Sequence, residues 1–357
     1  MTKHVLVTGG TGFLGVHLAR KFLKEGYKVT LFDIATLDAK DLIGKVKVIK
    51  GDIRNAKTVD KALKNQDYIV HAAAALPIQQ SKKIIFGINI DGTKNILHSA
   101  LQNKIKRLVF ISSTAVYGIP KHLPETEESP LDPIGFYGES KIRGEHLCKE
   151  YIKKGLSINI IRPKTFLGPE RLGVFELWFE AIFAGKKVFI LGNGKNPYQL
   201  LAVSDIVNAI EKALQNKISN EVFNLGAKEF GTWKNDLGAV IDYDAKSRPR
   251  DGRPLAEKSK IFGFPVLPSQ IILGILESLN LSPIAAWHYK TIAVPSYVSI
   301  EKAEKILKWH PKKSNKQLLI ESYKWYKEHR NEILGKTGTG HRVGWNFKTL
   351  NLIKKFF

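Results

Sequence analysis

A glycine-rich turn near the N-terminus constrains the fold of this chain more than any other feature. The turn, Gly9-Gly10-Thr11-Gly12-Phe13-Leu14-Gly15, follows the β-branched run Val5–Thr8 and opens an amphipathic helical pattern. Glycine permits the positive φ angles of a tight turn and lets a ligand approach the backbone closely. A strand, this turn and a helix in that order predict a doubly wound α/β sheet with a phosphate-binding loop after its first strand.

Strand and helix patterns alternate through the first half of the chain. Short β-branched runs are separated by helical patterns of about 10–20 residues. Alternation of this kind predicts a parallel sheet with helices on both faces, the Rossmann arrangement. The predicted strands are Val5–Thr8, Lys28–Phe32, Val46–Ile49, Tyr68–His71, Arg107–Ser112 and Ile158–Ile161.

Beyond Gly168 the alternation is less regular. At 357 residues the chain exceeds one ordinary core. We expect a dinucleotide-binding domain over residues 1–168, a smaller substrate-binding α/β region over 169–334 with some elements returning to the first sheet, and a tail over 335–357. In the second half we predict helices at Val174–Gly185, Asp205–Gln215, Ile300–Trp309 and Asn315–Glu332, strands at Val188–Leu191 and Val222–Leu225, and a loop at Asp244–Ala256.

The net charge and the single cysteine limit which partners and which cellular compartment we expect. The formal charge is +23, from 56 basic and 33 acidic residues, and most of the bases are lysines. We interpret this excess as a lysine-rich solvated surface, because no zinc-ligand spacing or RNA-binding motif accompanies it, and we expect neither metal nor nucleic acid. Cys148 cannot form an intrachain disulfide, and His4-Val5-Leu6-Val7 is a strand pattern rather than a secretory signal. We therefore expect a cytoplasmic protein.

The residues that end the predicted strands favour NAD as the bound dinucleotide. Asp33 ends the second strand about 20 residues after the glycines, where a carboxylate accepts from the ribose 2′-hydroxyl and repels a 2′-phosphate. Asp52 ends the third strand near the expected adenine, and small residues end the fourth. The predicted cofactor contacts from these segments are Gly9, Gly12, Phe13, Leu14, Gly15, Asp33, Asp52, Ile53, Ala72 and Ala73.

A Tyr-x-x-x-Lys pair, Tyr137 and Lys141, opens a helical pattern about 120 residues after the glycine turn. Residues four apart lie on one helix face, so both side chains can enter one site. A phenol with a pKa near 10 is a poor base at neutral pH, and a nearby ammonium favours its phenolate. Three hydroxyls, Ser112, Ser113 and Thr114, follow the fifth strand as candidates for a third member.

On these motifs the sequence resembles the extended short-chain dehydrogenase/reductases, the NAD-dependent epimerase/dehydratase family, over about residues 3–330. The family places its catalytic Ser or Thr four residues before the tyrosine of a Val-Tyr-Gly triplet, which is Ser113. Further matches are Asn89-x-x-Gly92-Thr93-x-Asn95, Arg162-Pro163, Gly168-Pro169 and Val203-x-Asp205.

The resemblance implies a catalytic set and a type of chemistry. It implies that Asn89, Lys141 and Pro163 lie along the NAD, and that Tyr137 takes a proton from a substrate hydroxyl to which Ser113 hydrogen-bonds. Hydride passes to NAD and returns to the other face of a transient keto intermediate. It also implies a homodimer through the helices of Asn89–Leu101 and Tyr137–Tyr151.

The substrate positions depart from the family pattern. Dehydratases carry Asp-Glu after the catalytic residue, where this chain has Thr114-Ala115, so epimerisation is favoured over dehydration. Epimerases contact the nucleotide diphosphate through an asparagine and an arginine, where this chain has Thr165 and Tyr198. Replacement charges would come from Lys164 or Arg171.

Three functions follow from these departures. The leading prediction is an epimerase acting on a nucleotide sugar. The alternatives are an NAD-dependent dehydrogenase of a sterol-like or isoprenoid alcohol and a non-catalytic NAD-binding regulatory protein. The intact Ser113, Tyr137 and Lys141 set argues against the last, because a sensor need not keep all three.

Two apolar stretches lie outside these motifs. Ile261–Ala286 is apolar but broken by Pro265, Pro268 and Pro283, which argues against a transmembrane helix and is consistent with the core of the smaller domain, an apolar pocket or contact with a membrane. Trp345–Phe357 has apolar residues at helical spacing among lysines. A basic amphipathic tail of this kind docks on its own protein or lies at a membrane interface.

Overall fold

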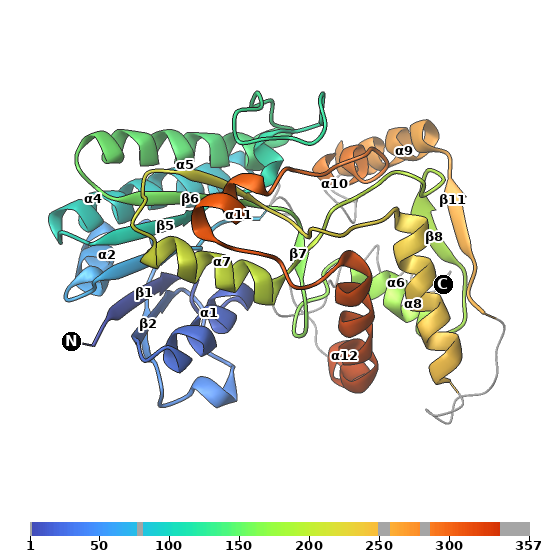
Figure 1. Ribbon diagram of the computed structural model, residues 1–357, viewed down its shortest axis with the longest axis horizontal. Helices are drawn as coiled ribbons and strands as arrows, with labels where there is room; N and C mark the ends of the chain where they lie inside the picture. The colour runs from blue at the N-terminus through green and yellow to red at the C-terminus, as the bar shows by residue number, and fades with distance from the viewer. Residues whose placement is uncertain (1, 77–80, 249–257, 279–285, 336–357) are drawn as a thin grey trace.

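A computed structural model of the chain describes residues 2–76, 81–248, 258–278 and 286–335. Its centre is a seven-stranded parallel sheet in the order β10-β6-β5-β4-β1-β2-β3, as Figure 1 shows. The strand order reverses between β1 and β4, and ligands of doubly wound sheets bind at such a switch point. The strands are β1 His4–Thr8, β2 Lys28–Asp33, β3 Lys47–Lys50, β4 Tyr68–His71, β5 Arg107–Ile111, β6 Ile158–Pro163 and β10 Val222–Leu225.

This architecture confirms the predicted α/β fold class with a Rossmann sheet. The predicted strands agree with the observed ones to within one or two residues. β3 begins at Lys47 instead of Val46, and β6 continues to Pro163. Short β-branched runs were sufficient signals here, because strands covered by helices on both faces are apolar along most of their length.

Helices cover both faces of the sheet (Figure 1). One face packs against α1 Phe13–Lys24, α7 Val203–Gln215 and α11 Glu301–Leu307, and the other against α2 Ala56–Leu63, α4 Thr93–Gln102 and α5 Gly135–Lys153. The shorter elements beside them are η1 Lys40–Leu42, α3 Lys82–Phe86, the π-helical turn η2 Gly87–Gly92 and the 3-10 turn η3 Thr114–Val116.

A second hydrophobic core lies at the right of Figure 1. Aromatic side chains fill it, including Trp178, Phe179, Trp233 and Tyr323. β10 and α11 follow residue 168 in the chain but pack on the Rossmann sheet. The remaining elements are β7 Phe166–Leu167, α6 Phe175–Phe183, β8 Val188–Leu191, β9 Leu201–Ala202, α8 Trp233–Ser247, β11 Ile261–Phe264, α9 Val266–Ser278, α10 Ala286–Thr291 and α12 Asn315–Gly335.

The prediction of a loop at Asp244–Ala256 is wrong for its first residues, because α8 continues to Ser247. The Asp244 carboxylate accepts from Arg248 Nε at 2.8 Å and from the Tyr323 hydroxyl at 2.5 Å. These buried partners stabilise a helical turn that the basic composition of the segment conceals. Residues 249–257 and the predicted tail over 335–357, apart from Gly335, lie outside the described residues.

Within the described ranges, no helix is both long enough and apolar enough to cross a bilayer. The same ranges contain no cluster of three or more His, Cys, Asp or Glu side chains placed to hold a metal ion.

Candidate active site

The glycine turn sits where β1 ends, tightly enclosed by its neighbours. Gly9 has a φ of +67°, and a Cβ there would lie 2.9 Å from the Cα of Ala73. A Cβ on Gly15 would lie 2.5 Å from the Cα of Gly10. α1 begins directly after Gly12, which provides no side-chain cap, so the amides of its first turn face the end of the sheet. This cradle suits a pyrophosphate at a helix N-terminus.

Asp33 joins the ends of β1 and β2. Its Oδ2 accepts from the amide of Thr11 at 3.0 Å, and its Oδ1 accepts from the amide of Ala35 at 3.1 Å. These two bonds fix the carboxylate beside the glycine turn while each oxygen keeps a further lone pair. The position therefore fits a dinucleotide ribose.

The residues predicted near the adenine lie after β3 and β4. Arg54 holds the Asp52 carboxylate with its Nη2 at 2.6 Å from Oδ2, and that bond lowers the Asp52 pKa. Ile53 is buried against Gly92. The Ala73 amide donates to Thr8 Oγ1 at 3.1 Å, so the chain after β4 lies against the glycine turn, as does Ala72. The sequence analysis missed Arg54, whose pairing depends on a turn.

Ser113, Tyr137 and Lys141 come together where β5 ends and α5 begins. Ser113 caps η3, with its Oγ accepting from the Ala115 amide at 3.1 Å. Lys141 Nζ donates to the Ile111 carbonyl at 2.8 Å and lies 5.8 Å from the centre of the Tyr137 ring. The lysine is thereby tied to the strand that carries Ser113.

Burial and neighbouring groups shift the pKa values of Tyr137 and Lys141 in opposite directions. Burial raises the pKa of Tyr137, while a hydrogen bond from Ser113 and the positive charge of Arg171 lower it. Burial also lowers the pKa of Lys141 to about 8, against the attraction of Glu145. The Arg171 guanidinium lies 5.6 Å from the Phe13 ring centre and therefore stands between the glycine turn and Tyr137.

Asn89 is buried and its amide is engaged by the protein itself. Oδ1 accepts from the Ala75 amide at 2.7 Å, and Nδ2 donates to Ser140 Oγ at 2.9 Å. The residue lies in the π-helical turn η2, a local geometry that is frequent at functional sites. Asn89 thus ties the segment after β4 to the helix that carries Tyr137.

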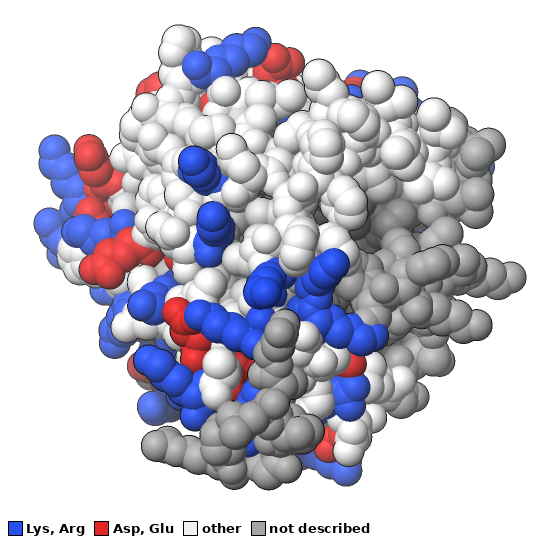
Figure 2. Space-filling view, turned by 90° about the vertical axis from the view of Figure 1, so that its right-hand side faces the viewer, with Lys and Arg blue, Asp and Glu red and all other residues white. Residues whose placement is uncertain are grey.

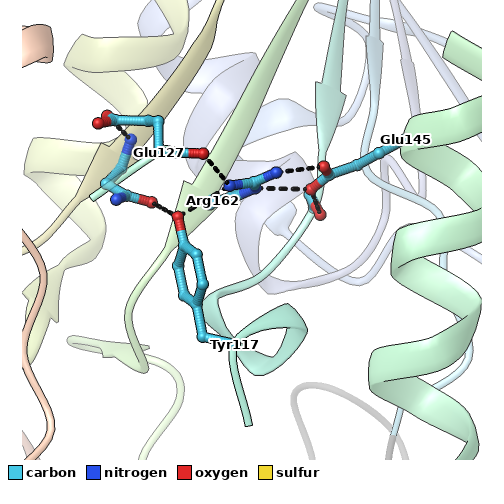
Figure 3. A network of polar contacts seen from close by, with 6 residues as sticks. Tyr117, Glu127, Glu145 and Arg162 are labelled. Atoms are coloured by element: carbon cyan, nitrogen blue, oxygen red, sulfur yellow. Dashed lines mark hydrogen bonds and ion pairs between the residues drawn. The ribbon is translucent and has the colours of Figure 1, made fainter. Parts of the chain in front are cut away.

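A buried ionic network, which the sequence analysis missed, holds α5 against β6 (Figure 3). Arg162 donates to Glu145 from Nε at 2.9 Å and from Nη2 at 2.6 Å. Arg162 Nη1 donates to the Tyr117 hydroxyl at 2.8 Å, and Ser112 Oγ donates to Glu145 at 2.6 Å. The only sequence signal for Glu145 is its place four residues after Lys141, on the same helix face.

A polar cavity flanks this centre at the predicted substrate positions. Lys164, which is 3% exposed, donates from Nζ to Ser296 Oγ at 2.6 Å and lies 4.8 Å from the Tyr198 ring centre. Burial lowers the Lys164 pKa to about 7, and Glu125 opposes that shift. Thr165 Oγ1 is 3.5 Å from the Tyr198 hydroxyl. The cavity is lined by Thr114, Tyr117, Gly118, Pro120, Glu125, Lys164, Thr291, Ser296, Tyr297 and Val298.

Glu125 and Ser296 were not predicted from the sequence. Burial raises the pKa of Glu125, and its Oε2 has no hydrogen-bond partner among the described residues. Ser296 meets Lys164 across 132 positions of sequence. No local motif signals either contact, because both depend on how the segment after α10 returns to the sheet.

The doubly wound sheet, the glycine cradle and the tyrosine–lysine centre define a dinucleotide-binding protein of the short-chain dehydrogenase type. A family model described as "NAD dependent epimerase/dehydratase family" matches residues 5–226, more than half of the chain. This chain belongs to that family, and the family assignment confirms NAD as the cofactor. The glycine cradle and Asp33 fit that cofactor, as described above.

Individual relatives agree with this assignment. The chain is similar to the uncharacterized protein y4nG of Sinorhizobium fredii, at 33% identity over 96% of this chain and 83% of that protein. It is also similar to a UDP-glucose 4-epimerase of Lactobacillus helveticus, at 32% identity over 62% of this chain and 76% of the relative. The fold matches the UDP-glucuronic acid 4-epimerase of Bacillus cereus in complex with NAD, with a TM-score of 0.72, 24% identity, and coverage of 91% and 99% of the two chains.

Proposed function

We propose that this protein is an NAD-dependent epimerase of a nucleotide sugar. The main support is that Ser113, Tyr137 and Lys141 converge at the end of β5. Thr114 and Ala115, which follow Ser113, do not provide the acid and base that dehydration needs. Thr114 donates to the Pro163 carbonyl at 3.3 Å, and Ala115 is 1% exposed and has no titratable group. The site therefore has an alcohol-oxidising base but lacks the acid and base pair of a dehydratase.

In this proposal Tyr137 accepts the proton of the substrate hydroxyl that is oxidised. Ser113 hydrogen-bonds the same oxygen, and Arg171 and Lys141 favour the phenolate through their positive charge. NAD, when bound, would supply the hydride acceptor for the oxidation and the hydride donor for the return step on the opposite face. Tyr137 then gives the proton back, so neither the cofactor nor the protein is changed overall.

The cofactor contacts follow from the same geometry. The amides after Gly12 would hold the pyrophosphate, Asp33 would accept from a ribose hydroxyl, and Ala72 and Ala73 would lie against the cofactor. Since the Asn89 amide already bonds Ala75 and Ser140, its role here is to position α5. The carbonyl of Pro163, at the end of β6, accepts from the Thr114 hydroxyl and so holds Thr114 in place.

Positive charge at the substrate end supports a nucleotide sugar. Thr165 and Tyr198 stand where epimerases contact the diphosphate, and neither is charged. Lys164 lies over the Tyr198 ring, and Arg171 lies over the ring of Phe166, which follows Thr165 in the chain. Both would carry the charge that the phosphates require. The names of the L. helveticus and B. cereus proteins, which specify UDP-sugars, agree with this substrate class.

A second candidate function rests on Tyr198. This side chain is 5% exposed and packs on Trp233 at a ring separation of 4.5 Å, so this wall of the site is aromatic instead of phosphate-binding. An apolar alcohol of sterol or isoprenoid type suits such a wall. That enzyme would be a net dehydrogenase and would release NADH.

Turnover assays distinguish the two functions. Purified protein is incubated with UDP- and GDP-sugars and with apolar secondary alcohols, with NADH followed by absorbance and sugar stereochemistry followed by NMR. Inverted sugar without accumulated NADH is expected. Stoichiometric NADH with an apolar alcohol, and no inversion of any sugar, would refute the epimerase proposal.

A substitution tests the proposed base. Tyr137→Phe should lower kcat by roughly 10²–10⁴-fold while NAD still binds, because the aromatic ring stays and only the hydroxyl that accepts the proton is lost. Tyr151→Phe is the matched control, since Tyr151 is a buried tyrosine on the same helix. Full activity in Tyr137→Phe would show that another group accepts the proton.

A further inference from the structure

An apolar surface covers the outer side of α9 and the neighbouring strand β11. On α9, Leu267, Ile271 and Ile275 follow one another at a spacing of four residues and are 73%, 62% and 55% exposed. Ile272 beside them is 58% exposed, and on β11 Phe262 and Phe264 are 39% and 49% exposed. We call these six side chains the α9 face. An exposed aliphatic and aromatic surface of this kind marks an interaction site.

The opposite side of α9 is anchored to the protein. Gln270 Nε2 donates to the Tyr289 carbonyl at 3.1 Å, and the Tyr289 side chain is 3% exposed below Gly274. β11 pairs with β8 and forms the edge of that two-stranded sheet. The α9 face is therefore held in place by a folded support and is not the consequence of an unpacked helix.

Basic residues outnumber acidic ones around the α9 face. The segments 186–195 and 258–278, which form β8, β11 and α9, contain five lysines and one acidic residue, Glu277. One of the lysines, Lys258, forms an ion pair with Asp242 of α8. Lys187 Nζ lies 4.8 Å from the Phe262 ring centre, at the edge of the face. Figure 2 shows this side of the molecule, with a broad uncharged area and both basic and acidic side chains around it. The lysines of the two segments are Lys186, Lys187, Lys195, Lys258 and Lys260.

This combination of charge and apolar surface selects one partner. A second copy of the chain on a two-fold axis would bring lysines against lysines, and like charges repel. A nucleic acid would pair with the lysines but leave the aliphatic side chains without an apolar partner. An anionic lipid surface satisfies both, because acyl chains accept the aliphatic side chains while headgroups pair with the ammonium groups.

We propose that the α9 face docks the protein peripherally on an anionic lipid bilayer. α9 lies in the plane of the interface, with Leu267, Ile271 and Ile275 inserted and the lysines at headgroup level. α10 follows α9 in the chain and ends at Thr291, which lines the cavity beside Lys164 together with Ser296. Docking therefore places the proposed substrate end of the site near the membrane surface. The proposal does not depend on the identity of the reaction.

Vesicle binding of the full chain tests it. Wild-type protein should sediment with vesicles of phosphatidylglycerol and phosphatidylcholine, and less with phosphatidylcholine alone or in high salt, which screens the lysines. Leu267→Glu/Ile271→Glu should lower the partition coefficient by at least about tenfold, because two carboxylates replace inserted side chains. Ile43→Glu/Ile218→Glu is the matched control, since these isoleucines are 63% and 47% exposed on loops elsewhere. Thermal unfolding and NAD binding check that each variant is folded.

Three outcomes would overturn the proposal. The first is equal sedimentation of the α9 and control variants with anionic vesicles. The second is sedimentation that disappears on removal of residues 336–357 but persists in Leu267→Glu/Ile271→Glu. The third is the absence of vesicle binding together with a wild-type oligomer that the α9 substitutions dissociate in light scattering. Loss of vesicle binding with unchanged turnover of a soluble substrate supports docking, whichever reaction the site performs.

Discussion

The Arg162–Glu145 pair gives the strongest stability prediction, because both side chains are almost fully buried at 2% and 0% exposure. We consider Arg162→Met, Glu145→Met and the double variant. Each single substitution leaves one buried charge without its partner. A broken buried ion pair typically costs 3–5 kcal/mol, so each single variant should lose about that much unfolding free energy.

The double variant should lose much less than the sum of the two. It removes both charges together and leaves two methionines of similar volume in an apolar site. Its remaining cost comes from Ser112, which loses its acceptor, and from the Glu127 carbonyl, which accepts from Arg162 at 3.1 Å. Unsatisfied groups of this kind cost roughly 1–3 kcal/mol each. The singles sum to roughly 6–10 kcal/mol and the double variant should cost roughly 2–6 kcal/mol, so the central expectation for the coupling is about 4 kcal/mol.

Urea titrations followed by tryptophan fluorescence measure the four unfolding free energies of this cycle. Arg143→Met and Glu139→Met supply the matched control, because that pair lies on the same helix at 2.5 Å but is 52% and 36% exposed. Its coupling should be only about 0.3–0.5 kcal/mol. Equal couplings for the two pairs, or additive losses at Arg162 and Glu145, would refute the role assigned to the network in Figure 3.

Three further predictions concern the cofactor and substrate ends of the site. Gly15→Ala should weaken NAD binding at least tenfold in calorimetry, because its Cβ would lie 2.5 Å from Gly10, whereas Gly238→Ala on α8 has open space and should bind normally. Burial lowers the pKa of His71 to about 3 in the folded protein, below the unfolded value near 6.5. The neutral imidazole therefore stabilises the fold fully above pH 6.5, and this contribution to the unfolding free energy is lost as the pH falls. Between pH 7 and 5 the wild type should lose about 2 kcal/mol more than His71→Gln in urea titrations, and equal losses would contradict this assignment. With the Lys164 pKa at about 7, the sugar-nucleotide KM should rise above pH 7 as its charge is lost, and Lys164→Met should remove that rise.

The sequence predicts the Rossmann sheet well because its signals are local. Each strand is a short β-branched run, and the turn after the first strand needs glycine at fixed positions, such as Gly9 with its positive φ. The same locality explains the predicted Tyr137–Lys141 pair and a hydroxyl near it, whereas the choice of Ser113 among three hydroxyls came from the family resemblance. Their positions follow from a strand end and from the i, i+4 spacing of a helix.

The missed residues depend on contacts between distant segments. Lys164 meets Ser296 only because the chain after α10 returns to the sheet, and Glu145 meets Arg162 only because α5 packs on β6. Neither Ser296 nor Glu145 carries a local sequence pattern that distinguishes it from a surface residue. Arg171 was predicted as a substrate contact, but its effect on the Tyr137 pKa follows from a loop that the sequence leaves undefined.

The apolar segment Ile261–Ala286 shows why composition alone does not assign a role. On α9, Val266 and Leu273 are partly buried while Leu267 and Ile271 are exposed, so apolar residues occur around the whole helix. A helix that is apolar on all sides is normally enclosed by protein or lipid. Here Gln270 and Gly274 contact Tyr289 on one side of α9, and the lysines beside the exposed side disfavour a like-charged copy. The described part of the segment, residues 261–278, is thus neither simple core nor a membrane span, and a surface between protein and lipid is the environment that satisfies both sides of α9.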